Sequence, residues 1–256
     1  MLASSARSLK AGVRTMHQYR SLPNVRITLN DDEVGRPMYE FFRSRTLGFP
    51  YHQWGTWGRA AMMLPETLSS YTKGKSRHPF RTNCMKASRL DYEAVPLTED
   101  SYVQGFRDCF RSTPVRQGSP VEMENWPYPG EPANREMMLS GCVDSAGDVI
   151  AVSRIVVSGQ TAWMRNLIGH ADHVNAGVMY LLMQFCVERL IAERSTPWPT
   201  WLMFDSYFSV SAGMRYFLDR IGMSPHNIRF DLGSPDLFPI RSIPAARSVP
   251  SLVGVG

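Results

Sequence analysis

Three motifs of known chemistry are incomplete in this sequence. His170 and His173 have the H-x-x-H spacing of some metal sites, but no third ligand and no catalytic glutamate accompany them, so no metal centre is predicted. Gly74-Lys75-Ser76 imitates the end of a phosphate-binding P-loop, yet Ser69 stands where its first glycine would be. No G-x-S-x-G occurs, so a serine hydrolase has no support.

Two polar residues inside an apolar strand are stronger candidates. Arg165 and Asn166 lie in the segment 161–168, between apolar neighbours on both sides. Because side chains alternate between the two faces of a strand, one of the pair should point inward. An inward polar group must be hydrogen-bonded or functional, so the pair is a candidate binding element.

A second apolar strand, residues 201–205, ends on Asp205 and is followed by Tyr207. Asp205 has two interpretations: it caps the next turn, or it is a carboxylate held at a strand end for proton transfer. Tyr207 is either a packed aromatic near the surface or a functional hydroxyl. General acid–base chemistry uses both residue types, provided that they lie within hydrogen-bond reach of the substrate.

The segment 67–90 contains six cations and no acid. Residues 74–90 have helical periodicity, with Phe80, Cys84, Ala87 and Leu90 on an apolar face. The charged arc is either a solvated helix face or a stripe that attracts anions. Few aromatics interleave with it, so sequence-specific RNA reading is not indicated. The candidate anion-binding or partner-binding residues are Lys75, Arg77, Arg81, Lys86 and Arg89.

Hydrophobic periodicity and turn residues predict the elements that position these groups. The order after residue 91 is β-α-β-β-β-α-β-α-β, with a long Pro- and Gly-rich loop at 113–134, which predicts an α+β fold. Helices are expected at 38–45, 77–90, 99–111, 178–192 and 212–221, and strands at 92–97, 137–143, 149–157, 161–168, 201–205 and 228–232.

The 256 residues carry 28 Lys and Arg against 23 Asp and Glu, a formal net charge of +5. The apolar content of 43% and the charged content of 20% exclude global disorder, and no apolar run is long enough for a membrane span. The excess positive charge is local, because residues 1–30 hold five basic side chains without an acid and the chain from residue 91 onward is acidic. Net charge therefore does not predict a nucleic-acid-binding protein.

The four cysteines have no C-x-x-C spacing, which predicts free, buried thiols in a reducing compartment such as the cytoplasm. The acid-free N-terminus fits either a solvated tail or an organellar presequence, and we favour the tail. The expected organisation is a basic flexible tail at 1–30, an N-terminal subdomain at 31–73, a main domain at 74–232 and a Pro-rich tail at 233–256.

The main domain resembles the GNAT acyltransferase superfamily, and in detail its Fem-type branch, the BioF2-like acetyltransferase domain that is related to peptidoglycan aminoacyl transferases. Three passages carry the resemblance: the basic helix from Arg77 through Asn83 to Ala87, the hairpin 139–151, and Phe204-Asp205 followed by 213–223. The resemblance implies a GNAT-like mixed, mostly antiparallel central sheet flanked by helices. Only 73 residues precede this domain, so the second, N-terminal half of such proteins would be truncated or degenerate here.

The resemblance also implies a site where the fourth and fifth strands separate, in which an amine is positioned beside an activated acyl carbon. Asp205 would be the base or would orient the amine, and Tyr207 or Tyr216 would donate a proton. The donor-binding residues would be Arg165, Asn166 and, in the loop before the helix 178–192, His170, His173, Asn175, Ala176 and Gly177.

Two departures from the family pattern bear on the donor. Acetyl-CoA-using members have a glycine-rich loop that holds the pyrophosphate, whereas the loop here has one glycine at the helix start. The usual acid tyrosine position is occupied by Leu218. We therefore expect an N-acyltransferase without a permanently bound cofactor. Its donor would be an acyl-thioester, a carrier protein or aminoacyl-tRNA, and its acceptor a small amine. An acetyl-CoA enzyme with an atypical loop and a non-catalytic binding module remain the alternatives.

Overall fold

The computed structural model describes residues 21–44, 58–116, 119–121, 137–192, 199–208 and 210–234. Its contacts divide the chain into two compact units. The first unit comprises Met1–Glu66, Val157–Met164 and Arg194–Ile240, and the second comprises Thr67–Val156, Arg165–Glu193 and Arg241–Gly256.

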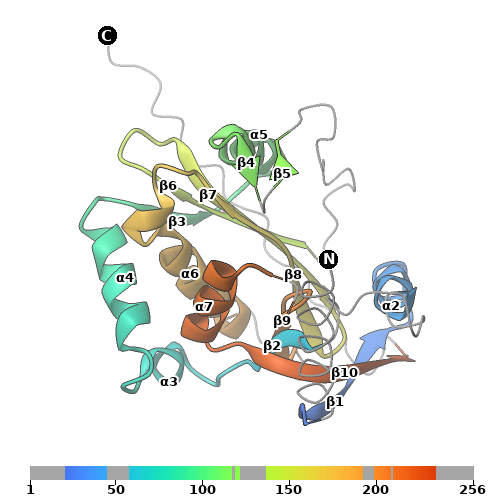
Figure 1. Ribbon diagram of the computed structural model, residues 1–256. Helices are drawn as coiled ribbons and strands as arrows, with labels where there is room; N and C mark the ends of the chain where they lie inside the picture. The colour runs from blue at the N-terminus through green and yellow to red at the C-terminus, as the bar shows by residue number, and fades with distance from the viewer. Residues whose placement is uncertain are drawn as a thin grey trace, which may run out of the picture. The chain divides into compact units, whose positions relative to one another are not determined.

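Eight strands form one mixed sheet: β1 (Asn24–Asn30), β2 (Arg59–Met63), β3 (Glu93–Pro96), β6 (Met137–Val143), β7 (Val149–Ser158), β8 (Thr161–Gly169), β9 (Trp201–Met203) and β10 (Ser224–Gly233). Their order is β1-β10-β2-β9-β8-β7-β6-β3 (Figure 1). The β1–β10 and β8–β9 pairs are parallel, while β10–β2, β2–β9, β3–β6 and β6–β7 are antiparallel. The expected mixed, mostly antiparallel sheet is confirmed. Two short strands, β4 (Val115–Arg116) and β5 (Ser119–Pro120), pair separately.

The helices are α2 (Gly35–Ser44), α3 (Leu68–Thr72), α4 (His78–Ser88), α5 (Glu99–Arg111), α6 (Val178–Ala192) and α7 (Ala212–Ile221), with a 3₁₀ turn η3 (Val174–Ala176). The expected bounds of α5, α6 and α7 are confirmed. Thr98 and Ser211 cap α5 and α7, since each side chain accepts a hydrogen bond from the first turn of its helix. None of the helices within the described ranges is long and apolar enough to cross a membrane.

The first unit begins with a strand that the sequence prediction missed. Residues 24–30 were expected in a flexible tail, but they form β1, with Ile27 and Leu29 fully buried. Apolar residues alternate with polar ones here, as in a half-buried strand, and the charge count concealed this pattern. β1 pairs with β10 on one side, and Gln160 in the β7–β8 turn donates to the Thr28 carbonyl oxygen at 2.9 Å on the other.

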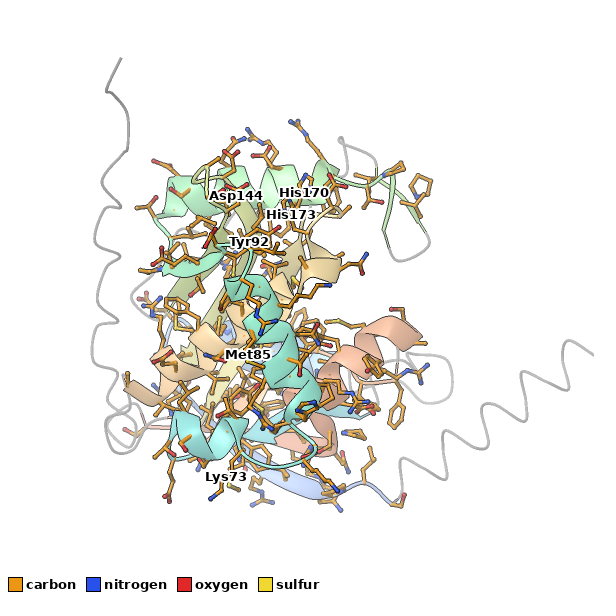
Figure 2. All side chains as sticks on the ribbon, turned by 90° about the vertical axis from the view of Figure 1, so that its left-hand side faces the viewer. Lys73, Met85, Tyr92, Asp144, His170 and His173 are labelled. Atoms are coloured by element: carbon orange, nitrogen blue, oxygen red, sulfur yellow. The ribbon has the colours of Figure 1, made fainter. Side chains whose placement is uncertain are left out.

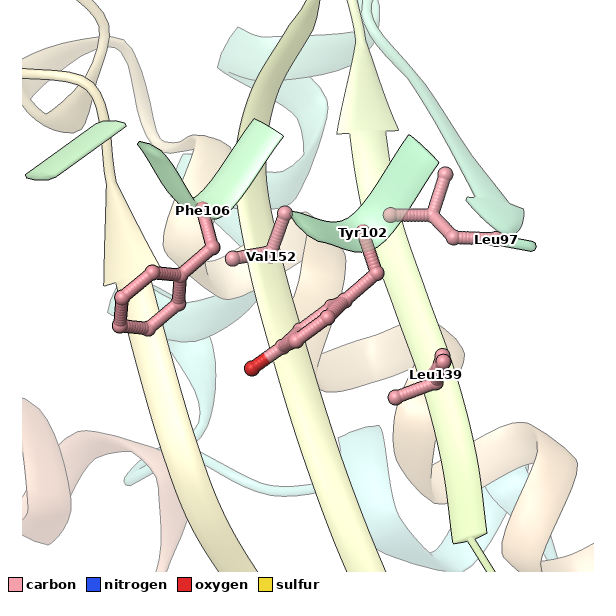
Figure 3. Close-up of a cluster of buried hydrophobic side chains, with 5 residues drawn as sticks. All are labelled: Leu97, Tyr102, Phe106, Leu139 and Val152. Carbon is pink, nitrogen blue, oxygen red and sulfur yellow. The ribbon is translucent and has the colours of Figure 1, made fainter. Parts of the chain in front are cut away.

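In the second unit, α5 and α6 lie against alternate side chains of β6. Leu139 belongs to a buried cluster with Leu97, Val152 and the α5 residues Tyr102 and Phe106 (Figure 3). The neighbouring Ser140 accepts from Arg189 of α6 at 3.4 Å, and Cys142 lies 3.7 Å from the Val178 carbonyl oxygen. Because successive strand residues point to opposite faces, the two helices cover opposite faces of this part of the sheet.

The cysteines are buried and free, as expected. Burial raises the pKa of the Cys84 thiol to about 12 and that of Cys186 to about 11. Since only the thiolate reacts, we expect a disulfide reagent to label these thiols at least about 100-fold more slowly in the native protein than in denaturant. In denaturant, the protein should react with four equivalents of the reagent, one for each cysteine. A rapid single equivalent from native protein would contradict the burial of that thiol.

Candidate functional site

Asp205 lies in an irregularity immediately after β9. The β2–β9 register pairs Ala61 with Met203, and the ladder continues with Phe204 donating to Ala60. Regular pairing would next make residue 206 the donor to Gly58, but Tyr207 donates instead, at 2.8 Å. One extra residue is therefore inserted, which is the definition of a β-bulge. The expected strand 201–205 is shorter than predicted, because the bulge interrupts it.

Two side chains of the first unit, Trp163 and Arg59, donate hydrogen bonds to Asp205 in this bulge. The Trp163 indole donates to Asp205 Oδ1 at 3.1 Å, so one carboxylate oxygen is fixed toward β8. Arg59 Nη1 donates to the Asp205 carbonyl oxygen at 3.3 Å, and Arg59 Nη2 donates to the Phe42 carbonyl oxygen at 3.4 Å. The Asp205 side chain is half-buried. The carboxylate is thus held in a fixed position by Trp163.

Arg59 is a buried cation that the sequence analysis did not single out. Only 4% of it is exposed, and its guanidinium lies 4.5 Å from the centroid of the Phe42 ring. Phe42 in turn stacks on Phe230 at 4.5 Å and contacts Trp163 edge-on at 5.0 Å. The available sequence signal was a charged residue at the start of the otherwise apolar strand 59–63. The aromatic enclosure and carbonyl acceptors compensate for part of the cost of burying its charge.

Tyr207 is bonded to a carboxylate. Its hydroxyl donates to Asp219 Oδ1 at 2.6 Å. Loss of solvent, and then the bond to Asp219, raise the pKa of Tyr207 to about 12. The phenol therefore keeps its proton at neutral pH and directs it at Asp219, which makes Tyr207 a weaker proton donor than expected.

Tyr216 lies on α7 and is 55% exposed, with the Arg220 guanidinium 4.7 Å above its ring. Asp205, Tyr207 and Tyr216 all belong to the first unit. Asp205 contacts Trp163 and Arg59. Tyr207 contacts Asp219, and Tyr216 contacts Arg220.

The parallel β8–β9 ladder is short. It joins Thr161 to Trp201, Ala162 to Leu202 and Trp163 to Met203, whereas β8 continues to Gly169. Beyond the paired segment, Arg165 is exposed and Asn166 is half-buried. The Oδ1 atom of Asn166 is buried and has no hydrogen-bond partner among the described residues, so Asn166 is the inward member of the pair.

A second buried polar group, Tyr102, was also missed. Only 2% of Tyr102, which Figure 3 shows in the cluster with Phe106, is exposed. Its hydroxyl, like the Asn166 oxygen, has no hydrogen-bond partner in the part of the chain that the structure describes. Burial raises the pKa of the phenol well above its ordinary value, while the charges of Arg154 and Arg165 oppose the rise. Arg154 is itself 1% exposed, and its Nε donates to Met137 Sδ at 2.9 Å. In the sequence, helical periodicity places Tyr102 on one side of the helix 99–111 with Phe106, Cys109 and Phe110, where it is expected to pack as an aromatic side chain.

The loop between β8 and α6 lies in the second unit and uses several of its own amides. His173 and Val174 donate to the His170 carbonyl oxygen at 3.0 and 3.1 Å, and Ala176 donates to that of His173 at 2.9 Å. The Tyr92 hydroxyl is hydrogen-bonded to His173 Nδ1 at 2.7 Å, and Figure 2 shows both beside His170. These bonds leave fewer amides for a pyrophosphate than a glycine-rich loop would.

Gly177, at the end of this loop, is required for packing. Its φ is +89°, and a Cβ at this position would overlap the Asn83 carbonyl oxygen of α4. Lys86 of α4 also donates to the carbonyl oxygen of Asn175, at 2.7 Å. The basic helix and the candidate donor loop, which are about 90 residues apart in sequence, are therefore held together within this unit.

Several cations of the basic segment have internal partners. Arg81 donates to the carbonyl oxygens of Thr72 and Gly74 and so caps the end of α3. Arg77 lies 5.0 Å from the Tyr71 ring centroid. Lys75 and Arg89 are exposed. Leu90, expected on the apolar face, lies beyond the end of α4 and is 46% exposed. Structural contacts thus account for part of the charge that suggested an anion-binding stripe.

Arg81 and Arg89 also line a groove of about 820 Å³ between α3, α4 and α6, together with Met85 of α4, which is labelled in Figure 2. In the described part of the chain, no group of three or more His, Cys, Asp or Glu side chains is arranged to hold a metal ion.

No protein-family model and no curated protein matches this chain. Similar solved structures include L-PGS from Bacillus licheniformis, at 12% identity and a TM-score of 0.44, covering 66% of this chain and 60% of that one. A putative lysylphosphatidylglycerol synthetase C-terminal domain from Agrobacterium fabrum has 13% identity, a TM-score of 0.44, and coverage of 66% and 58%. A GCN5-related N-acetyltransferase from Kribbella flavida has 9% identity, a TM-score of 0.40, and coverage of 66% and 53%.

The chain spans less than two thirds of the length of each of these three structures. At such low identities and TM-scores, we base the description of the fold on the strand order and contacts given above.

Proposed function

We propose that the protein is a GNAT-type N-acyltransferase that moves an acyl or aminoacyl group from an activated donor to an amine. The element order β3-α5-β6-β7-β8-α6-β9-α7-β10 is the order that the resemblance to this superfamily implies. The paired β8 and β9 correspond to the fourth and fifth strands of such a domain, between which the acyl group is held.

The observation that carries the proposal is Asp205 in a bulge at the point where the parallel β8–β9 ladder ends. Bulges occur next to active sites because they redirect a side chain. Here the bulge follows the third and last residue pair, Trp163–Met203, and Trp163 binds the carboxylate directly. A capping role alone would not need the indole donor or the buried Arg59 on the carbonyl oxygen.

In the proposed reaction, the amine nitrogen forms a bond to the acyl carbon, and the thioester or ester bond of the donor breaks. Asp205 accepts the proton that the amine loses, and Tyr216 supplies one proton to the leaving thiolate or alkoxide. We favour Tyr216 over Tyr207, since the Tyr207 proton is directed at Asp219 and its pKa is raised to about 12. Positioning and proton transfer are then the main contributions of the protein.

Donor binding is proposed for Arg165, Asn166 and the loop residues His170, His173, Asn175, Ala176 and Gly177, with Lys75, Arg77, Arg81, Lys86 and Arg89 attracting an anionic donor. The internally bonded amides of this loop favour a carrier protein or aminoacyl-tRNA over acetyl-CoA as donor. A donor of either kind brings additional contacts that can replace a pyrophosphate cradle.

The test is to incubate the protein with acetyl-CoA, an acylated carrier protein and aminoacyl-tRNA, each with a labelled acyl group, and a mixture of small amines. We expect one donor to lose its label to an amine, identified by mass spectrometry, in a reaction absent from heat-denatured protein. If none of the three donors is consumed or bound, the transferase assignment is wrong.

A further inference from the structure

A cavity of about 420 Å³ in the first unit has a cationic lining. It is formed by β1, β10 and α2, which lie side by side in Figure 1. Three arginines line it, one from each element: Arg26, Arg229 and Arg43. Among the described residues that line it, the acidic side chain is Asp231, so the lining has a net charge of +2.

The strand register brings two of these arginines together. β1 and β10 are parallel, and Arg26 is the direct cross-strand neighbour of Arg229. Like charges in directly opposite positions destabilise a sheet. Asp231 compensates for part of this repulsion, because it accepts from Arg26 Nε at 3.3 Å. The remaining positive charge of the lining favours an anion in the cavity.

A further cation adds to the positive potential. The buried Arg59 guanidinium lies 5.7 Å from the ring centroid of Phe230, and Phe230 and Phe42 both belong to the lining. The three arginines of the lining are exposed, so an anion from solvent can reach them. Guanidinium groups suit phosphate in particular, because their planar fork donates two parallel hydrogen bonds to its oxygens.

We infer that this pocket binds the phosphate or pyrophosphate group of a ligand. Its volume lies within the range of small-molecule sites, about 300–1,000 Å³, and exceeds what a single ion requires. The assignment of that phosphate to the acyl donor rests on the proposed function. It would place the anionic part of the donor at β1 and β10.

The experiment uses inorganic pyrophosphate as the probe and isothermal titration calorimetry at low ionic strength as the measurement. We expect Arg229→Gln and Arg43→Gln each to weaken binding about tenfold, since each removes a charge-assisted contact. Asp231→Asn should tighten binding severalfold, because it removes the negative charge and releases Arg26. Arg36→Gln is the matched control: Arg36 is on α2 like Arg43 and loses the same charge, but it pairs with Asp31 outside the pocket.

Either of two results would overturn the inference. The first is that the wild-type protein shows no binding at millimolar pyrophosphate. The second is that Arg36→Gln weakens pyrophosphate binding as much as Arg229→Gln does, because the effect would then come from net charge alone. Thermal unfolding of each variant checks that the fold is intact. A second arm compares coenzyme A with pantetheine, which lacks phosphate. If the pocket variants change pyrophosphate binding as expected but no donor transfers its acyl group, the pocket assignment is correct and the transferase assignment is wrong.

Discussion

Asp205→Asn is expected to lower the rate of acyl transfer by about 10²–10⁴-fold, the usual contribution of a positioned general base. Asparagine has nearly the same shape, and its amide oxygen can still accept from Trp163, so the bulge should persist. The loss should fall on kcat, because the carboxylate acts when the amine releases its proton. Steady-state kinetics with the donor identified above would measure it.

The matched control is Asp148→Asn, which removes the same charge from the exposed turn between β6 and β7. It should leave kcat unchanged. Thermal unfolding of Asp205→Asn should agree with the wild type, which separates a chemical effect from a folding effect. A fully active, folded Asp205→Asn protein would show that Asp205 is a structural cap.

Gly177→Ala is expected to lower the free energy of unfolding by about 3 kcal/mol or more. Alanine in the left-handed region costs roughly 1–2 kcal/mol, and the added Cβ would also overlap the Asn83 carbonyl oxygen. Backbone on a neighbouring helix cannot rotate away as a flexible side chain can. The loop and α4 must therefore separate. Urea unfolding of both proteins measures the difference.

Gly147→Ala isolates the steric part of this effect. Gly147 has nearly the same φ, +86°, but nothing lies within 4 Å of the position its Cβ would take. We expect Gly147→Ala to lower the free energy of unfolding only by the cost of placing alanine in the left-handed region, roughly 1–2 kcal/mol. Equal losses in the two variants would mean that the contact between Gly177 and α4 contributes nothing.

Local patterns were sufficient for most elements of the main domain. The 3.6-residue periodicity of α5 and α7 and the apolar run of α6 indicated these helices, and Thr98 and Ser211 cap α5 and α7. Turn residues defined the hairpin between β6 and β7. Asp205 was identifiable for the same reason, since a carboxylate that ends an apolar strand stands out in the sequence.

Local sequence patterns did not predict the interactions between segments that are distant in the chain. The bulge at Asp205 depends on where β9 pairs with β2, about 140 residues earlier, and no short window contains both. Arg59 and Arg154 looked like ordinary charged residues because burial depends on what packs against them. The loop before α6 was expected to bind a donor, and its contacts with Asn83 and Lys86 add a packing role.

The sequence by itself thus determined the type and order of the main-domain elements, through periodicities that each segment carries alone. Only the tertiary structure decided which cations share a pocket. Arg26, Arg43 and Arg229 come from three separate elements, and the parallel register of β1 with β10 brings two of them side by side. Electrostatic interaction depends on distance in space, so a charge count along the chain could not reveal this site.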